Sequence, residues 1–343
     1  MAESHVNGGT GAIPFSVLDL ATIFEGGGPR EALANSLELA RHAERLGFRR
    51  IWVAEHHNMQ SVASSAPAVV IGALAAATTS IRVGSGGVML PNHAPLVIAE
   101  QFGTLEALYP GRIDLGLGRA PGTDLRTARA LRRDIAASAE SFPQDVQELQ
   151  ALFGPPEPGQ TLRAIPGSDS RVPIWLLGSS TFSAQLAALL GLPFAFASHF
   201  APAQLLPALD IYRSRFRPSA QLERPYAMVA VNAVAAPTDA EAQRHFTSIK
   251  QAFLNMQRGV SSPIPPPIDP GDERLAPLEQ AGGPSMLAYS AVGAPETVRR
   301  SLQSIIARTG ADELMVTSHI FEREARLRSL EMVAAVRDEL AAS

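Results

Sequence analysis

The chain alternates between short apolar runs and longer stretches in which apolar side chains recur at helical spacing. Short apolar runs predict strands, and recurrence every three or four residues predicts helices. The predicted strands span Phe15–Leu20, Arg50–Ala54, Ile81–Leu90, Ile113–Leu117, Val172–Leu177, Pro193–Ala197, Tyr226–Ala235 and Glu313–Thr317. The predicted helices span Arg30–Leu46, Pro67–Thr79, Ala94–Leu108, Ser138–Leu152, Ser180–Leu190, Pro202–Phe216, Asp239–Gln257, Pro295–Arg308 and Glu324–Leu340.

This alternation of strand and helix predicts an α/β fold with a parallel sheet. Consecutive parallel strands need right-handed helical crossovers, and eight such units form a (β/α)8 TIM barrel. A doubly wound open sheet is the alternative, because periodicity does not show whether a sheet closes. We therefore expect one barrel domain over residues 13–343, preceded by a flexible polar tail at residues 1–12.

One proline-rich segment, Gly259–Pro284, interrupts the alternation. Its prolines exclude a long helix or a central strand, because proline lacks the N–H that both need. Long stretches without a pattern are usually functional loops or disordered. The segment precedes the closing strand, at the rim where barrels carry their active sites, so we predict a mobile lid over 259–284. A passive loop is the alternative.

Composition excludes several classes of protein. The chain has 29 basic and 33 acidic residues, a net charge of −4, so it lacks the basic excess that nucleic acids select. The absence of cysteine removes disulfides, thiolate metal sites and cysteine nucleophiles, and fits a reducing compartment. No apolar window is long enough to span a membrane, and the N-terminus does not resemble a secretory signal. We expect a cytoplasmic protein that binds neither nucleic acid nor membranes.

Candidate chemistry is sought at the carboxyl ends of the strands, where barrel enzymes place their working groups. The second predicted strand is followed by Glu55, His56 and His57. Neighbouring side chains of an extended segment point opposite ways, so at most one of these histidines faces the barrel mouth. Histidine exchanges protons near neutral pH. A hydrogen-bonded pair that fixes the loop is the alternative.

A metal site that recruits His93 and His199 is a third possibility for these histidines. The sequence has no HxH or HExxH spacing, so we predict no metal.

The third and fourth strands end in glycine-rich turns. Gly84, Gly86 and Gly87 indicate either a bulge or the close approach of a ligand. In the turn 116–122, Arg119 either donates hydrogen bonds to a planar ligand or forms a surface salt bridge. The glycine spacing of this turn does not match the dinucleotide-binding fingerprint.

The fifth strand runs through the turn 177–183 directly into a helix. Unpaired N–H groups at a helix start, together with nearby hydroxyls, can bind a phosphate. Capping of the helix by Ser179 or Ser180 is the alternative. Together the four turns describe a planar ligand near an arginine and a histidine, with its phosphate on a helix N-terminus.

Five stretches in this order resemble the bacterial luciferase-like flavin monooxygenases, and the resemblance runs from Ile13 to Val336. The stretches are Ile51–His57, Ile81–Pro91, Pro110–Arg119, Pro173–Ser180 and Val292–Glu296. The resemblance implies a (β/α)8 barrel that binds reduced FMN. It also implies that the proline-rich segment is the mobile loop that shields the site.

The resemblance assigns roles to individual residues. It implies that His56 is the catalytic acid/base, that Gly86 and Gly87 form a cis peptide beneath the flavin ring, and that Arg119 contacts the flavin. The phosphate-binding turn corresponds to Gly178, Ser179, Ser180 and Ser183.

The chain departs from the luciferase α subunit at two positions. Gly118 replaces a reactive cysteine, and Ser179 replaces a glutamate in the phosphate turn. The resemblance is therefore to the single-subunit branch, some members of which oxygenate polyketides and other natural products.

We accordingly predict an FMN-dependent monooxygenase that hydroxylates or epoxidises an organic substrate, such as a polyketide, with O2. A separate NAD(P)H:flavin reductase is expected to supply the reduced FMN. The alternatives are an F420-dependent hydride-transfer enzyme on the same fold and a non-catalytic flavin-binding protein. By analogy we expect a homodimer, joined through the helices after the second and third strands.

Overall fold

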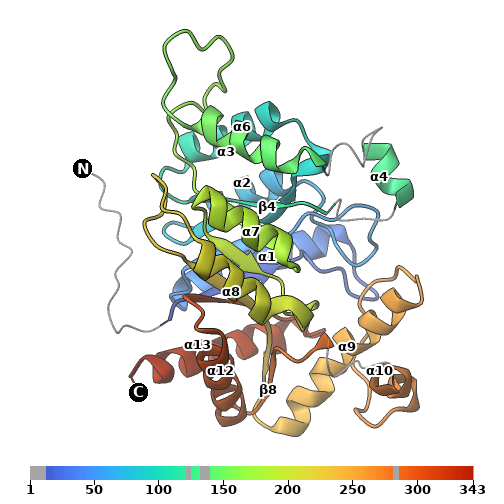
Figure 1. The fold of residues 1–343 in the computed structure, drawn as a ribbon. Coiled ribbons are helices and arrows are strands. Elements are labelled where there is room, and N and C mark those ends of the chain that lie inside the picture. The colour runs from blue at the N-terminus through green and yellow to red at the C-terminus, as the bar shows by residue number, and fades with distance from the viewer. Residues whose placement is uncertain (1–12, 121–124, 132–139, 281–285, 343) are drawn as a thin grey trace.

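The strands of the protein form a single nine-stranded sheet. The computed structural model describes residues 13–120, 125–131, 140–280 and 286–342 (Figure 1). The strands are β1 (Phe15–Asp19), β2 (Arg50–Val53), β3 (Arg82–Met89), β4 (Ile113–Gly118), β5 (Ile174–Gly178), β6 (Phe194–Phe196), β7 (Ala227–Ala235), β8 (Ser290–Gly293) and β9 (Glu313–Thr317).

Eight of these strands close into a barrel. Strands β1 to β7 pair in chain order, β7 also pairs with β9, and β9 returns to β1 with Phe15 opposite Leu314. All of these pairings are parallel. The predicted (β/α)8 barrel is therefore confirmed, and the open doubly wound sheet is excluded because β9 joins β1.

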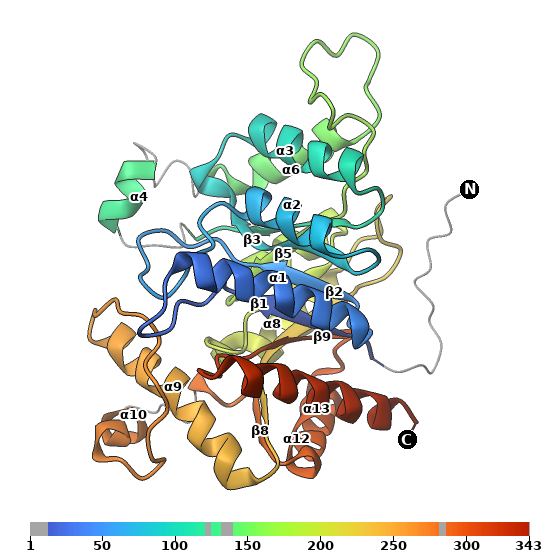
Figure 2. The ribbon, with the colours of Figure 1, turned by 180° about the vertical axis from the view of Figure 1, so that it is seen from behind.

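Helices surround the barrel on the outside. Figure 1 shows α7 and α8 covering one side, and Figure 2 shows α1, α2 and α13 covering the other. The principal helices are α1 (Pro29–Arg45), α2 (Pro67–Ala77), α3 (Pro95–Leu108), α6 (Phe142–Phe153), α7 (Thr181–Leu190), α8 (Leu205–Arg215), α9 (Asp239–Gln257), α12 (Pro295–Thr309) and α13 (Arg323–Ala342). Within the described ranges, none of the helices has the length and apolar character needed to cross a bilayer.

Strand β8 and helix α4 (Leu125–Leu131) were not predicted. Strand β8 lies outside the barrel, beside the C-terminal part of β7, with Asn232 opposite Ser290. Its four residues are too few to show an alternating pattern. The helix predicted from Ser138 is observed as α6 from Phe142, and Ser138 lies outside the described residues.

The proline-rich segment contains two short helices that were not predicted, η3 (Glu273–Leu275) and α10 (Ala276–Gln280). Proline is tolerated in a first helical turn, so Pro277 does not prevent α10. Leu275 and Leu278 are buried in the cluster that includes Phe253 of α9. The predicted lid over 259–284 stays a prediction. Its residues 281–284 and the predicted tail 1–12 lie outside the described residues.

The amino end of the barrel is filled by a buried ionic network. Nη1 of Arg50 lies 2.7 Å from Oδ2 of Asp114, and its Nε lies 2.8 Å from Oε1 of Glu313. Burial alone would raise the pKa of Asp114, but the charges of Arg50 and Arg82 hold that pKa below its ordinary value. The buried Trp52 joins this network, because its Nε1 donates a hydrogen bond to Oδ2 of Asp114 at 3.2 Å.

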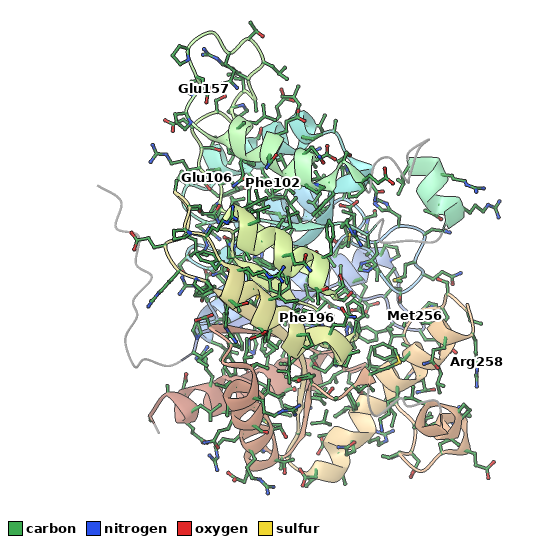
Figure 3. The ribbon with its side chains drawn as sticks, viewed as in Figure 1. Phe102, Glu106, Glu157, Phe196, Met256 and Arg258 are labelled. Carbon is green, nitrogen blue, oxygen red and sulfur yellow. The ribbon has the colours of Figure 1, made fainter. Side chains whose placement is uncertain are left out.

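Buried and peripheral side chains lie in different parts of the molecule. Phe196, at the end of β6, is fully buried and lies centrally in Figure 3. Glu157 lies in the loop between α6 and β5, which projects away from the barrel in the same view.

Candidate functional site

The predicted site residues come together at one end of the barrel. His56 follows β2, Gly86 and Gly87 lie in β3, Arg119 follows β4, and the turn that begins at Gly178 follows β5. Parallel strands direct their carboxyl ends to the same rim. We call this end the C-terminal rim.

Glu55 is the buried anchor of the β2 turn. Its Oε1 accepts hydrogen bonds from Nε2 of His57 and from Nε2 of His93, each at 2.8 Å. Its Oε2 accepts from the backbone N–H of Met89 at 3.0 Å. Burial alone would raise the pKa of Glu55, but these hydrogen bonds and the charge of His93 hold the pKa below its ordinary value. Glu55 is therefore a carboxylate that ties β2 to the end of β3.

The two neighbouring histidines have different environments. His57 is held by Glu55, as the alternative of a loop-fixing contact predicts. By the alternation of the strand, His56 continues the inward-facing series of Arg50 and Trp52. The Nδ1 atom of His56 is buried and has no hydrogen-bond partner among the described residues.

The protonation state of His56 follows from its surroundings. Burial lowers the pKa of His56, and the opposing attraction of Glu55 is countered by His57. The imidazole is therefore neutral near pH 7, with one ring nitrogen available to a ligand.

The glycines of β3 are packed against neighbouring strands. A Cβ atom on Gly86 would lie 2.9 Å from Cδ1 of Leu18, and a Cβ on Gly87 would lie 2.8 Å from the carbonyl oxygen of Gly116. The register with β4 shifts between Gly86 and Val88, which marks a bulge or irregularity of β3 at these glycines, and the close approach of a ligand stays a prediction. The Gly86–Gly87 peptide bond is cis, in agreement with the resemblance.

Arg119 connects β4 to the helix after β5. Its Cζ lies 4.0 Å from the centre of the Phe182 ring, a cation–π contact. Arg119 is exposed, and it forms no salt bridge with any residue that the structure describes. The surface salt bridge considered for this position is therefore not observed.

The turn between β5 and α7 leaves Ser180 free of a capping role. Ser180 occupies the N-cap position of α7, but its side chain makes no capping hydrogen bond. The backbone N–H of Thr181 is instead satisfied by Oε1 of Gln204 at 3.3 Å. Ser179 is exposed, whereas Ser183 is buried next to Gly178. Capping by Ser180, one of the two alternatives, is thus wrong.

Sequence reasoning missed two further groups at the rim. His319 follows β9 by two residues, and Asn232 lies in β7, in register with Thr317. His199, considered only as a metal ligand, follows β6 at the same rim. The signal that could have found His319 is its position just after a strand, which it shares with His56. Over the described ranges, no three histidine or acidic residues are grouped to hold a metal ion.

Comparison with known proteins agrees with this geometry. The family model for luciferase-like monooxygenases matches residues 13–313. A luciferase-like monooxygenase of Escherichia coli (strain K12) is 56% identical over 328 residues, which cover 96% of this chain and 98% of that protein. An N-acetyl-S-alkylcysteine monooxygenase of Bacillus subtilis (strain 168) is 39% identical over 253 residues, 72% of this chain and 75% of that protein. The solved structure of apo-MsnO8 is 39% identical, with a TM-score of 0.86, covering 95% of this chain and 98% of that one.

More distant solved structures share the fold and carry either of two cofactors. The oxygenating constituent of 3,6-diketocamphane monooxygenase from Pseudomonas putida, in complex with FMN, is 17% identical with a TM-score of 0.69, covering 97% of this chain and 98% of that one. An F420-dependent secondary alcohol dehydrogenase with an F420–acetone adduct is 14% identical with a TM-score of 0.67, covering 95% and 99%. From the match over residues 13–313 and the identity to full-length relatives, we conclude that this chain belongs to the luciferase-like monooxygenase family.

Proposed function

We propose that this protein is an FMN-dependent monooxygenase that works in the cytoplasm with reduced FMN supplied by a separate NAD(P)H:flavin reductase. The observation that carries the proposal is that three groups at the C-terminal rim lack a partner among the described residues. These are the buried Nδ1 of His56, the exposed Arg119 guanidinium, which has no carboxylate partner there, and the Ser180 hydroxyl, which makes no capping hydrogen bond. Each is a group that an anionic, planar cofactor would satisfy.

The turn between β5 and α7 suits the phosphate of FMN. The positive dipole end of helix α7 lies at the rim, where the N–H of Thr181 is already bonded to Gln204. Ser179, Ser180 and Ser183 lie at the start of this helix and supply hydroxyl donors. We assign the phosphate to these serines and to the Gly178 turn.

Arg119 and the β3 glycines suit the flavin ring system. Phe182 holds the Arg119 guanidinium next to the phosphate turn. Arg119 can therefore contact the flavin ring while the start of α7 binds the phosphate. Gly86 and Gly87 pack so closely against Leu18 and the carbonyl oxygen of Gly116 that no side chain fits at either position. We assign the ring to the surface between these glycines and Arg119.

Reduced FMN, when bound, supplies the two electrons with which O2 yields one oxygen atom for the substrate and one molecule of water. The chain's own part is binding, orientation and proton transfer. His56 is neutral and half-buried, so it can take a proton from the reacting group and return it later. Glu55 does not reach the reaction directly, because both of its oxygens are used within the protein.

The experiment is product analysis with isotopic oxygen. The purified protein is supplied with FMN, a flavin reductase, NADH and 18O2, and is offered aromatic polyketides, alkenes, aldehydes and thioethers. We expect one 18O atom in a product and stoichiometric NADH use. Parallel reactions with reduced F420 test the alternative cofactor. Turnover with F420 and no 18O incorporation would replace the proposal with a hydride-transfer function.

A non-catalytic role is tested in the same experiment. FMN binding without any product, and with unchanged oxygen uptake after His56→Ala, would leave flavin binding as the function.

A further inference from the structure

Two histidines that the proposed chemistry does not use flank the end of β7. His199 follows β6 and His319 follows β9, and both of these strands pair with β7. The two side chains therefore belong to the same stretch of the C-terminal rim. His199 also lies close enough to His319 and His56 for their charges to act on it.

The backbone of His199 is held firmly in place. Nδ2 of Asn232 donates a hydrogen bond to the carbonyl oxygen of His199 at 2.7 Å. Oγ of Ser198 donates to the carbonyl oxygen of Ala230 at 2.6 Å. Asn232 and Ser198 are both buried, so these bonds tie the end of β6 to β7. The imidazole is thus presented from a rigid support, as a binding residue needs.

The hydrogen-bonding state of the two histidines differs. Nδ1 of His319 lies 3.3 Å from Oγ1 of Thr22, and its Nε2 lies 3.5 Å from Oγ1 of Thr317. Nδ1 of His199 is buried and has no partner among the described residues. Buried polar atoms are ordinarily paired, so an unpaired ring nitrogen at the mouth of a barrel marks a place for a ligand atom.

The charge around His199 restricts which ligand atom fits. Burial lowers the pKa of His199 to about 3, and the positive charges that His319 and His56 carry when protonated act in the same direction. The imidazole is therefore neutral at physiological pH. Arg326, the cation beside His319, is already paired with Asp19 at 2.8 Å and donates to the carbonyl oxygen of Ser318. Among the described residues, no uncommitted positive charge beside His319 would pair with an anionic group.

We propose that His199 is a substrate-contacting residue, and that its neutral imidazole binds an uncharged hydrogen-bonding group of the organic substrate, such as a hydroxyl or a carbonyl. This inference rests on the proposed monooxygenase function, because it takes the same rim as the substrate site. It names the substrate class as neutral and polar, and it disfavours carboxylates, sulfonates and phosphates.

The test uses four probes with one carbon ring: cyclohexanol, cyclohexanone, cyclohexanecarboxylate and methylcyclohexane. Binding to the full-length protein, with and without oxidised FMN, is followed by 15N NMR of labelled histidine. The His199 signals are assigned by their loss in His199→Leu. We expect the alcohol and the ketone to shift these signals and to bind about two- to twelvefold more tightly than the other two probes, the range for one neutral hydrogen bond. The signals of His42, on α1, should not move.

Two variants separate a binding role from a structural one. His199→Leu should abolish the preference for the alcohol and ketone. His199→Asn, which keeps an amide nitrogen near the position of Nδ1, should retain the preference. Thermal unfolding of both variants checks that they fold.

Three outcomes would overturn the inference: equal or tighter binding of the carboxylate, a preference that survives in a folded His199→Leu protein, or no millimolar binding of any probe. Flavin fluorescence measures the FMN affinity of the wild type. This affinity distinguishes failure of the inference about His199 from failure of the proposed function. FMN binding without a probe preference refutes only the role of His199. A probe preference without FMN binding refutes only the assigned cofactor.

Discussion

The guanidinium of Arg119 lies over the ring of Phe182, with Cζ 4.0 Å from the ring centre. This contact joins the residue that follows β4 to the first turn of α7, the helix that follows β5. It positions an exposed cation next to the serines to which we assign the flavin phosphate. The assignment of the flavin site therefore depends on a contact between residues more than 60 positions apart.

We expect Phe182→Leu to weaken FMN binding by loosening Arg119. A cation–π contact at an exposed site contributes about 0.5–1 kcal/mol, so the dissociation constant should rise about two- to fivefold. Arg119→Met should weaken binding more, because it removes the donors as well. Flavin fluorescence titration measures both constants. Equal affinities in the wild type and in Arg119→Met would remove Arg119 from the flavin site.

His56→Ala should retain FMN and lose coupled turnover. Loss of a positioned acid/base group lowers rates by about 10²–10⁴-fold. Oxygen uptake, product formation and hydrogen peroxide release are measured together, and we expect peroxide to replace product. His56→Asn serves as the size control. A loss of FMN affinity parallel to the loss of turnover would make His56 a structural residue.

Ser180→Ala combined with Ser183→Ala should weaken FMN binding. Each hydrogen bond to a charged phosphate contributes about 1.5–3 kcal/mol, so the loss should be large. Ser180 makes no capping bond, so its replacement alone should leave the melting temperature unchanged.

The matched control for this prediction is Thr238→Ala at the start of α9. Oγ1 of Thr238 accepts a hydrogen bond from the Glu241 N–H at 3.2 Å, so this cap should contribute about 1 kcal/mol to stability. The control should therefore lower stability and leave FMN affinity intact. The reverse pattern, in which only the Ser180 variant loses stability, contradicts our account of the turn.

The free energy of unfolding should fall as the pH drops below about 6.5. Burial lowers the pKa of His199 to about 3 and that of His319 to about 4, and it also lowers the pKa of His56. In the unfolded chain these groups titrate near pH 6.5, so below this pH the unfolded state binds more protons than the folded state. The stability is complete above pH 6.5 and is lost progressively below it, by about 1.4 kcal/mol per pH unit for each histidine.

Urea unfolding at pH 7.5, 6.0 and 5.0 measures this dependence. Carboxylates with lowered pKa values, such as Glu55 and Asp114, lose their contribution only at more acidic pH, so they do not obscure the histidines in this window. His319→Gln should flatten the slope. A slope that is unchanged in this variant would mean that His319 is charged in the folded protein.

We expect the protein to form a homodimer through α2 and α3. The segment of α2 contains no charged residue, and Val69 on its outer surface is 74% exposed. An exposed apolar helix face of this kind is typical of an interface. Val69→Glu should shift the protein from dimer to monomer, as measured by light scattering after gel filtration. Met256→Glu, at another exposed apolar position on α9, is the control. A monomeric wild type contradicts the prediction.

The strand and helix pattern predicted the barrel well because the signals for each element lie within that element's own sequence. All nine predicted helices and all of the barrel strands begin or end within a few residues of their predicted limits, since apolar periodicity and glycine or proline boundaries lie within the elements themselves. Strand β8 was not predicted, because four residues are too few to show an alternating pattern. Helices α4 and α10 escaped because they are short and lie in segments of mixed composition.

Candidate site residues could be named from the sequence where a polar residue follows directly after a strand. His56, Arg119 and the serine turn were named in this way, and their roles stay predictions. The roles of Glu55 and His199 were not, because they depend on partners that are distant in sequence. Glu55 holds His93 across 38 positions, and the anchor of His199, Asn232, lies 33 positions away.

The sequence by itself determined that eight strands alternate with helices, that glycines and polar residues follow the strand ends, and that no thiol chemistry is available. Only the tertiary structure decided which of these polar atoms are satisfied by the protein and which are left free. The physical reason is that hydrogen-bond satisfaction is a property of three-dimensional neighbours. Glu55 occupies the nitrogen of His57 while Nδ1 of His56, one residue away, has no partner in the described part of the chain.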